Sequence, residues 1–212
     1  MKRNIVITGE SGAGKSSVVQ IARALRDSAP ALAQTVAFPI RYSTRAPRTA
    51  EDTEETRIVS HIEFRRLIAI GHIDIWWSRG LRDAWAEPNL YGFARADEAS
   101  KIYSANSAFF SMPTTRLKPI LDHATVIYVT AQKAAKLQRL SDRSPEMALS
   151  ELNARLAESG SLALSRADYI IDNTAHGFSA LTLHAVSILK LVCGRHLTLT
   201  PDQTLQTIAR AA

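Results

Sequence analysis

The sequence predicts an α/β fold in which a five-stranded parallel sheet is flanked by helices. Short apolar and β-branched runs alternate along the chain with segments whose apolar residues recur at helical spacing. A glycine-rich loop follows the first strand-like run and precedes a helical pattern, an order typical of sheets that bind phosphate groups at their carboxyl edge. The chain has 212 residues. Since a chain of this length can bury about 70% of its unfolded surface, we expect one domain with elaborations.

Five runs of residues have the composition of buried strands. They are rich in apolar and β-branched side chains and are bounded by glycine, proline or polar residues. Pro39 predicts a bend or a sheet edge within the second run, and Pro113 ends the third. The predicted strands are residues 4–8, 35–44, 107–112, 125–130 and 167–172.

Seven further segments are predicted as helices, and two of them, residues 16–28 and 61–71, have apolar residues at helical spacing. Pro30 ends the first of them, and Pro119 is a flaw within the fourth. The predicted helices are residues 16–28, 61–71, 96–104, 114–123, 131–143, 145–158 and 178–193. Residues 194–212 have weak periodicity, so we interpret them as a C-terminal appendage to a single domain formed by residues 1–193.

Composition and charge limit the classes of protein and partner. The apolar and charged fractions of 46% and 22% are ordinary for a soluble globular chain and exclude a disordered, collagen-like or coiled-coil one. The net charge of +6 favours an anionic partner, whether nucleic acid, a membrane surface or a phosphorylated small molecule. One cysteine, Cys193, excludes an internal disulfide. With neither a membrane-length apolar window nor a signal-peptide core, the sequence predicts a cytoplasmic protein.

The glycine-rich loop matches the phosphate-binding pattern G-x-x-x-x-G-K-[ST] at every fixed position. Its backbone N–H groups and the start of the next helix would hold phosphate oxygens. Lys15 would neutralise charge on the β- and γ-phosphates, and Ser16 would be a ligand of Mg²⁺. The predicted nucleotide-binding residues are Gly9, Glu10, Ser11, Gly12, Ala13, Gly14, Lys15, Ser16 and Ser17.

This loop alone does not distinguish a GTPase, an ATPase motor and a small-molecule kinase. Neither residues 107–112 nor residues 125–130 end in the acidic residue that an ATPase motor uses to hold magnesium, and no Asn-Lys-x-Asp guanine-reading motif is evident. A kinase needs arginines near the transferring phosphoryl group, and two clusters could supply them. The alternative is that both clusters are solvated basic surfaces. The clusters are Arg41, Arg45 and Arg48, and Arg139, Arg143 and Arg155.

From about Arg3 to Leu183 the sequence resembles the guanylate kinase superfamily. The resemblance is carried by the phosphate loop, by Ser43-Thr44-Arg45-Ala46-Pro47-Arg48, by Tyr91-Gly92, and by the residues around Leu137–Arg143, Arg155 and Ala167–Asn173. It implies ATP, Mg²⁺ and phosphoryl transfer to an already phosphorylated acceptor. It also implies an acceptor-binding insertion at about residues 38–98 and an arginine lid at about 132–158. By this resemblance Arg45, Arg48 and Tyr91 hold the acceptor phosphate, and Arg139, Arg143 and Arg155, with Lys15, act at the transferring group.

The guanine-reading residues of that superfamily are absent from this sequence. Arg41 stands where guanylate kinases have a serine, and Phe93 stands where they have Ser or Thr after Tyr-Gly. Neither Ile75 nor Ala84, the two candidates that precede a tryptophan, can replace the base-reading glutamate. A site built for guanine would leave the base edge unpaired here, so we do not expect GMP as the acceptor.

The ribose 1,5-bisphosphate phosphokinase branch is more similar. Its Arg-Tyr-x-Thr-Arg loop matches Arg41-Tyr42-Ser43-Thr44-Arg45, and residues 151–157 match a second run. This resemblance implies ribose 1,5-bisphosphate as the acceptor, 5-phosphoribosyl 1-diphosphate as the product, and Arg116 as a further substrate-binding residue. A guanylate kinase with an altered base site, a kinase of another acceptor and a non-catalytic interaction module remain alternatives, although the intact Lys15-Ser16 argues against the last.

Several features leave their roles open. The three tryptophans Trp76, Trp77 and Trp85 either line an acceptor pocket or pack the insertion onto the core. The six histidines have no metal-ligand spacing, and no nucleic-acid-binding signature or membrane segment is evident. We therefore expect a phosphorylated small molecule as the partner. The oligomeric state is open, a homodimer included.

Overall fold

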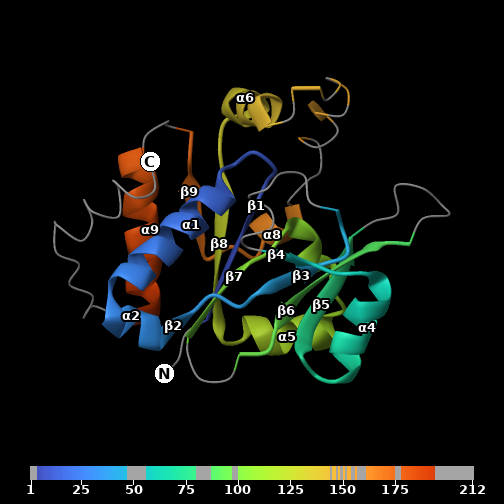
Figure 1. The fold of residues 1–212 in the computed structure, drawn as a ribbon. Coiled ribbons are helices and arrows are strands. Elements are labelled where there is room, and N and C mark those ends of the chain that lie inside the picture. Colours follow the sequence, from blue (N-terminus) through green and yellow to red (C-terminus); the bar gives the residue numbers. More distant parts are fainter. Residues whose placement is uncertain are drawn as a thin grey trace.

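The computed structural model describes residues 4–46, 56–79, 87–96, 100–143, 161–174 and 178–193, with isolated positions between 145 and 156. Most of the predicted helix 145–158 and the whole of the appendage 194–212 lie outside these residues. Figure 1 shows a core sheet covered by helices on both faces and a second, smaller sheet beside it. In the part of the chain that is described, every helix is too short or too polar to cross a membrane.

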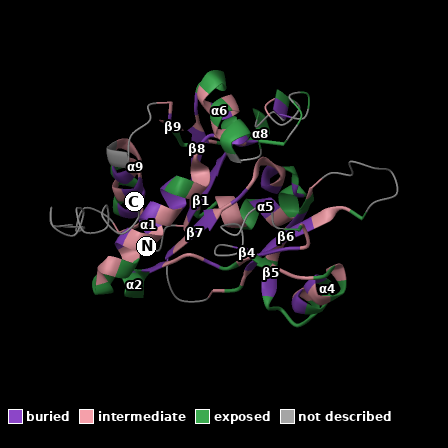
Figure 2. Cartoon of the chain, turned by 45° about the horizontal axis from the view of Figure 1, so that its top comes forward, coloured by how far each residue is buried: buried purple, intermediate pink, exposed green. Residues whose placement is uncertain are grey.

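The core sheet has five parallel strands among the described residues, as the sequence predicts. The central strand pairs on both sides, with Ile5 opposite Ile102 on one neighbour and opposite Thr125 on the other. Because helices cover both faces, the central strands are buried along most of their length (Figure 2). In sheet order, the strands are β2 (Val36–Ala37), β7 (Ser100–Ser104), β1 (Asn4–Gly9), β8 (Ala124–Thr130) and β9 (Tyr169–Asp172).

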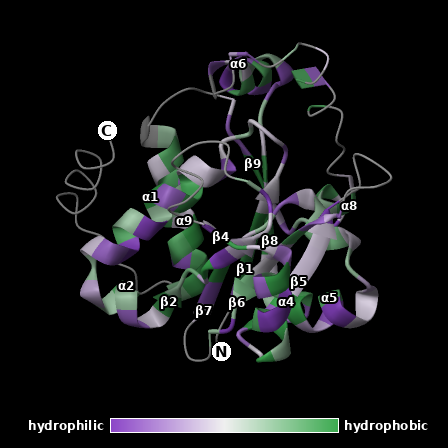
Figure 3. Ribbon diagram, turned by 45° about the vertical axis from the view of Figure 1, so that its right-hand side comes forward, coloured by the Kyte–Doolittle hydropathy of each residue, from purple (hydrophilic) through white to green (hydrophobic). Residues whose placement is uncertain are grey.

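Helices on the two faces of the core sheet pack against two different apolar clusters. Ile5 and Ile7 of β1 point toward α1 and α9, whereas Val6 points to the opposite face, because side chains alternate along a strand. Figure 3 colours α9 largely green, which fits its burial against the sheet. One face carries α1 (Lys15–Ser28), α2 (Pro30–Thr35) and α9 (Phe178–Cys193), and the other η1 (Ser107–Ser111), α5 (Thr114–Leu121) and α8 (Ser161–Leu164).

The second sheet is formed by part of the predicted insertion. Its strand order is β4-β3-β6-β5, with β3 parallel to β4 and antiparallel to β6. One helix, α4, packs on it through the fully buried Phe64. The elements are β3 (Arg41–Ser43), β4 (Thr56–Ile58), α4 (His61–Ala69), β5 (Ile73–Arg79) and β6 (Asn89–Ala94).

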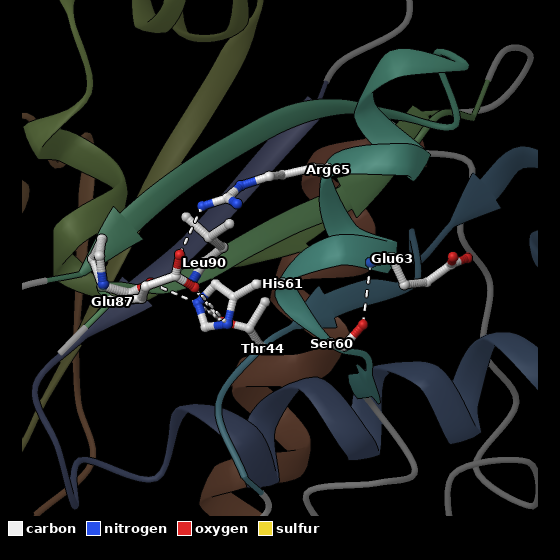
Figure 4. Close-up of polar contacts among 8 residues, drawn as sticks. Thr44, Ser60, His61, Glu63, Arg65, Glu87 and Leu90 are labelled. Carbon is white, nitrogen blue, oxygen red and sulfur yellow. Dashed lines mark hydrogen bonds and ion pairs between the residues drawn. The ribbon is translucent and has the colours of Figure 1, made fainter.

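The start of α4 is tied to the segment that enters β6 (Figure 4). Ser60 caps the helix by accepting a hydrogen bond from the Glu63 backbone N–H at 3.2 Å. The Nε2 atom of His61 lies 3.1 Å from Thr44 Oγ1 and 3.0 Å from the Pro88 carbonyl oxygen. Thr44 Oγ1 in turn accepts a hydrogen bond from Leu90 N at 2.9 Å. These contacts fix the ends of β3 and β6 relative to each other.

The structure corrects the predicted third strand. Residues 107–112, predicted as a strand, instead form the 3₁₀ helix η1, and the third core strand is β7, within residues 96–104 that were predicted to be a helix. Phe109 and Phe110 are buried by ring packing, with centroids 5.3 Å apart. A short apolar run does not by itself distinguish a strand from a buried helical turn, and tertiary packing decided here.

The predicted strand 35–44 is also divided. Val36–Ala37 pairs with β7 in the core sheet, whereas Arg41–Ser43 pairs with β4 and β6 in the second sheet. Pro39 lies between them, at the point where the chain leaves one sheet for the other, because it has no N–H to donate to a ladder. Similarly, Pro30 follows the end of α1 and also begins α2, since proline is favoured in the first turn of a helix.

Candidate functional site

The residues predicted to bind the nucleotide and several of those predicted to bind the acceptor meet around one cavity of about 260 Å³. It lies at the carboxyl edge of the core sheet, between the phosphate loop and the second sheet. Ala13 belongs to the loop but is fully buried behind it. The lining residues are Gly9, Glu10, Ser11, Gly12, Gly14, Lys15, Ser16, Ser17, Arg41, Arg45, Arg79, Tyr91, Asn106, Ser107, Arg139 and Leu140.

The phosphate loop has a backbone that requires glycine. Gly12 and Gly14 have φ angles of 76° and 87°, in the left-handed region that other residues rarely adopt. A Cβ atom on Gly14 would lie 2.2 Å from Asn173 Nδ2, so a side chain has no room there. The glycines of the sequence motif are therefore needed for two reasons: the backbone angles of the loop and, at Gly14, the lack of room for a side chain.

Side chains from two neighbouring elements hold the outward carbonyls of this loop. Arg139 Nη1, from α6 (Lys133–Arg143), donates to the Gly12 carbonyl oxygen at 3.2 Å, and Asn173 Nδ2 donates to that of Ala13 at 2.8 Å. Arg139 Nη2 also donates to the Asn173 carbonyl oxygen at 2.7 Å. A loop whose carbonyls are held from outside can offer its N–H groups to an anion.

The start of α1 adds to the anion site. Lys15 and Ser16 occupy its first two positions, and the first turn contains no acidic residue. The positive end of the helix dipole is therefore directed at the cavity without a competing carboxylate in the helix.

The Ser16 hydroxyl, at the second position of α1, lines the cavity and could be a ligand of a magnesium ion bound with a nucleotide. Among the described residues no group of three His, Cys, Asp or Glu side chains could hold a metal. Mg²⁺ commonly takes few protein ligands and completes its shell with waters and substrate phosphates. The residues present fit an ion of that kind, brought by the nucleotide.

The opposite wall of the cavity is arginine-rich. Arg41 connects the two sheets, because its Nε donates to Thr56 Oγ1 at 2.8 Å and its Nη1 donates to the Ser104 carbonyl oxygen at 3.3 Å. Arg45 follows β3, and its backbone N–H donates to Ser43 Oγ at 3.0 Å. A smaller cavity of about 50 Å³ adjoins this wall and is lined by Arg41, Ser43, Arg45, Ala46, Thr56, Ile58 and Tyr91.

Four lining residues were not among the predicted site residues: Arg79, Asn106, Ser107 and Leu140. Arg79 ends β5, which lies within residues 72–95, where the sequence predicts neither a helix nor a strand. Asn106 follows β7, and its Oδ1 accepts a hydrogen bond from Trp77 Nε1 at 3.0 Å. Ligands bind beyond the carboxyl ends of parallel strands, so a correct assignment of β7 would have pointed to Asn106 and Ser107.

Arg116, a predicted substrate-binding residue, is not brought to the cavity. Its guanidinium carbon lies 4.1 Å from the centroid of the Trp76 ring, and its Nη2 donates to the Trp76 carbonyl oxygen at 2.8 Å. Burial lowers its pKa. In this structure Arg116 joins α5 to β5.

Of the tryptophans, Trp77 packs the second sheet onto the core. It is 2% exposed and its ring contacts those of Tyr91, Phe93 and Phe109 at centroid distances of 5.2 to 5.8 Å. Phe93, at a guanine-reading position of the superfamily, is 1% exposed within the same cluster. Trp85, Arg48 and Arg155 lie outside the described residues, as does the side chain of Arg143, the last residue of α6.

Comparison with known proteins finds relatives in sequence and solved structures of similar fold. The chain is 33% identical over 177 residues to a ribose 1,5-bisphosphate phosphokinase from Acidiphilium cryptum, which covers 81% of this chain and 83% of that protein. It is 40% identical over 75 residues to a guanylate kinase from Rhodococcus jostii, 35% of this chain and 33% of that protein. Its fold is similar to the crystal structure of guanylate kinase from Anaplasma phagocytophilum, with a TM-score of 0.52, 16% identity, and coverage of 93% of this chain and 88% of that one. No family model matches the sequence.

Proposed function

Since the chain belongs to the guanylate kinase superfamily, we propose that it transfers the γ-phosphoryl group of ATP to ribose 1,5-bisphosphate, giving ADP and 5-phosphoribosyl 1-diphosphate. That the chain is a kinase follows from its relatives in sequence, both of which are named as kinases. Its fold is similar to that of a guanylate kinase. The acceptor is the proposed part. It is supported by the relative that covers most of the chain, whose name gives ribose 1,5-bisphosphate as its substrate.

The observation that carries the proposed acceptor is the arginine-rich wall opposite the phosphate loop. Arg41, Arg45 and Arg79 all line the cavity, and Glu10 is the one acidic side chain among its described lining residues. A sugar bisphosphate brings two phosphate groups and no base, so forked guanidinium donors suit it better than base-reading groups do. GMP would bring one phosphate and a base edge that needs hydrogen-bonding partners.

The positions that read guanine in the superfamily support the same acceptor. Arg41 donates to Thr56 and to the Ser104 carbonyl, so this position presents a cation where a base reader would need a hydroxyl. Phe93 is buried in the aromatic cluster. Neither side chain offers the acceptor and donor pattern of a guanine site.

In the proposed reaction, residues of this chain bind, orient and neutralise. The phosphate loop and Lys15 hold the β- and γ-phosphates of ATP. The Ser16 hydroxyl would be a protein ligand of Mg²⁺, which when bound would supply charge that neutralises the phosphates. Arg45, Arg48 and Tyr91 hold the acceptor phosphate. Arg139, Arg143 and Arg155 stabilise the transferring group, within a lid formed by about residues 132–158.

The direct test is turnover with a panel of acceptors. The protein is incubated with ATP and Mg²⁺ and with ribose 1,5-bisphosphate, GMP, other nucleoside monophosphates or other sugar phosphates, and ADP release is followed. We expect turnover of the bisphosphate and the appearance of 5-phosphoribosyl 1-diphosphate in the product mixture. Turnover of GMP without turnover of the bisphosphate would instead establish a guanylate kinase, the alternative supported by the shorter match. The Lys15→Ala variant is the control for contaminating kinases.

A further inference from the structure

An acidic residue lies inside the phosphate loop. Glu10 is the second residue of the loop and lines the cavity. Its Oε2 accepts a hydrogen bond from Thr130 Oγ1 at 3.0 Å and lies 2.5 Å from Lys136 Nζ. Its side chain is 23% exposed and that of Lys136 only 10%, so the pair is largely withdrawn from water.

A carboxylate at this place opposes the binding of a polyphosphate. Both are negative, and the repulsion between them is stronger in a partly buried site than in water because the effective dielectric is lower. The other charged residues among the described ones that line the cavity, Lys15 and four arginines, are cationic. Glu10 therefore needs a local cation if the loop is to hold phosphate groups.

Lys136 is the cation that the structure pairs with this carboxylate. It lies in α6, and one turn later on the same helix Arg139 is bonded to two backbone carbonyls, those of Gly12 and Asn173. The backbone of α6 also packs directly on the loop, since a Cβ atom on Gly12 would lie 2.7 Å from the Lys136 carbonyl oxygen. The helix thus presents the ammonium group to Glu10 at a fixed distance.

We propose that Lys136 is a positioning residue for nucleotide binding that acts through Glu10. It neutralises the carboxylate and, together with Thr130, keeps it turned toward β8 and α6 rather than toward the phosphate groups. Lys136 does not touch the nucleotide in this arrangement. The inference rests on the proposed nucleotide site but is independent of which acceptor the enzyme uses.

The experiment compares four variants of the full chain: Lys136→Met, Glu10→Gln, the double variant and Lys133→Met. Lys133 is an exposed lysine at the start of the same helix and serves as the matched control. Dissociation constants for ADP and ATP are measured by calorimetry, KM and kcat by ADP release, and Tm by thermal unfolding.

We expect Lys136→Met to weaken nucleotide binding by about tenfold or more, because it leaves a partly buried carboxylate without its cation beside the phosphates. The loss should raise the KM for ATP more than it lowers kcat. Replacing Glu10 by Gln in the same chain should restore affinity to within about threefold of the wild type, since the uncompensated charge is then absent. Lys133→Met should bind like the wild type.

Each of the following outcomes decides for or against the inference. If the double variant binds as weakly as Lys136→Met, Lys136 contacts the nucleotide or supports the fold, and does not act through Glu10. If Lys136→Met binds ADP and ATP like the wild type, the pair has no role in binding. If Lys136→Met does not fold, nucleotide binding by Glu10→Gln decides the question. Binding by this variant that is at least as tight as that of the wild type supports the inference. Weaker binding overturns it, because Glu10 would then itself be a nucleotide or metal ligand. If the wild-type chain binds no nucleotide, the proposed function is overturned together with the inference. If the wild-type chain binds nucleotide and only the comparison of variants fails, the inference alone is overturned.

Discussion

The two walls of the cavity are built in different ways. The phosphate loop comes from one continuous segment, residues 9–17, and its shape is set by glycine backbone angles and by hydrogen bonds from Arg139 and Asn173 to its carbonyls. The opposite wall is assembled from β3, β5, β6 and the residues that follow β7. Its charged groups are arginine side chains. A local, backbone-built wall can keep its ligand class through large sequence changes. A wall of separate side chains can change its ligand by single substitutions.

The largest expected effect comes from breaking the local wall. Lys15→Ala should lower kcat on the order of a hundredfold or more, because the cation that neutralises the β- and γ-phosphates is lost where charge develops in the transition state. Steady-state ADP release with saturating ATP and acceptor measures this. A fully active variant would contradict the assignment of the loop.

Arg45→Ala breaks the assembled wall at its predicted centre. We expect a loss on the order of a hundredfold in kcat/KM for the acceptor, because a forked donor to the acceptor phosphate is removed. The KM for ATP should change little, since Arg45 belongs to the second sheet and not to the phosphate loop. An equal rise in both KM values would mean that the two walls do not act separately.

Arg79→Ala sharpens the same comparison, because Arg79 lines the cavity from the end of β5. The expected effect is about a tenfold rise in the KM for ribose 1,5-bisphosphate, with a smaller rise for acceptors that carry one phosphate. Acceptor titrations at saturating ATP give the ratio. If the KM rises equally for acceptors with one and with two phosphate groups, Arg79 does not bind the second phosphate.

The smallest effect is expected for Arg116→Ala, outside both walls. Loss of the contact with the Trp76 ring and of the hydrogen bond to its carbonyl should cost about 1 kcal/mol of stability, measured by denaturant unfolding. The acceptor KM should stay unchanged. A clear rise in that KM at unaltered stability would instead favour Arg116 as a substrate-binding residue, as the resemblance implies.

Local patterns in the sequence predicted several elements correctly. The strands at β1, β8 and β9 are confirmed, as is the helix α9, because their apolar residues follow a period that local geometry imposes. Residues 96–112 were predicted wrongly, with β7 and η1 exchanged. Residues 96–104 include Asp97, Glu98 and Lys101, yet β7 pairs with β1 and β2 in the core sheet. The apolar residues 107–111 form η1 instead, and Phe109 packs on Trp77 of the second sheet.

The sequence by itself determined the α/β class with a parallel core sheet, the place of the phosphate loop and the arginines in and after β3. The glycine pattern is local, and the motif order is specific, so no long-range information was needed. Only the tertiary structure decided which side chains share the cavity. Arg79, Asn106 and Ser107 line the cavity, whereas Arg116 contacts Trp76 outside it. Lys136 contacts Glu10, although the two residues are 126 positions apart in the sequence. Such contacts depend on how sheets and helices meet, which neither periodicity nor a motif encodes.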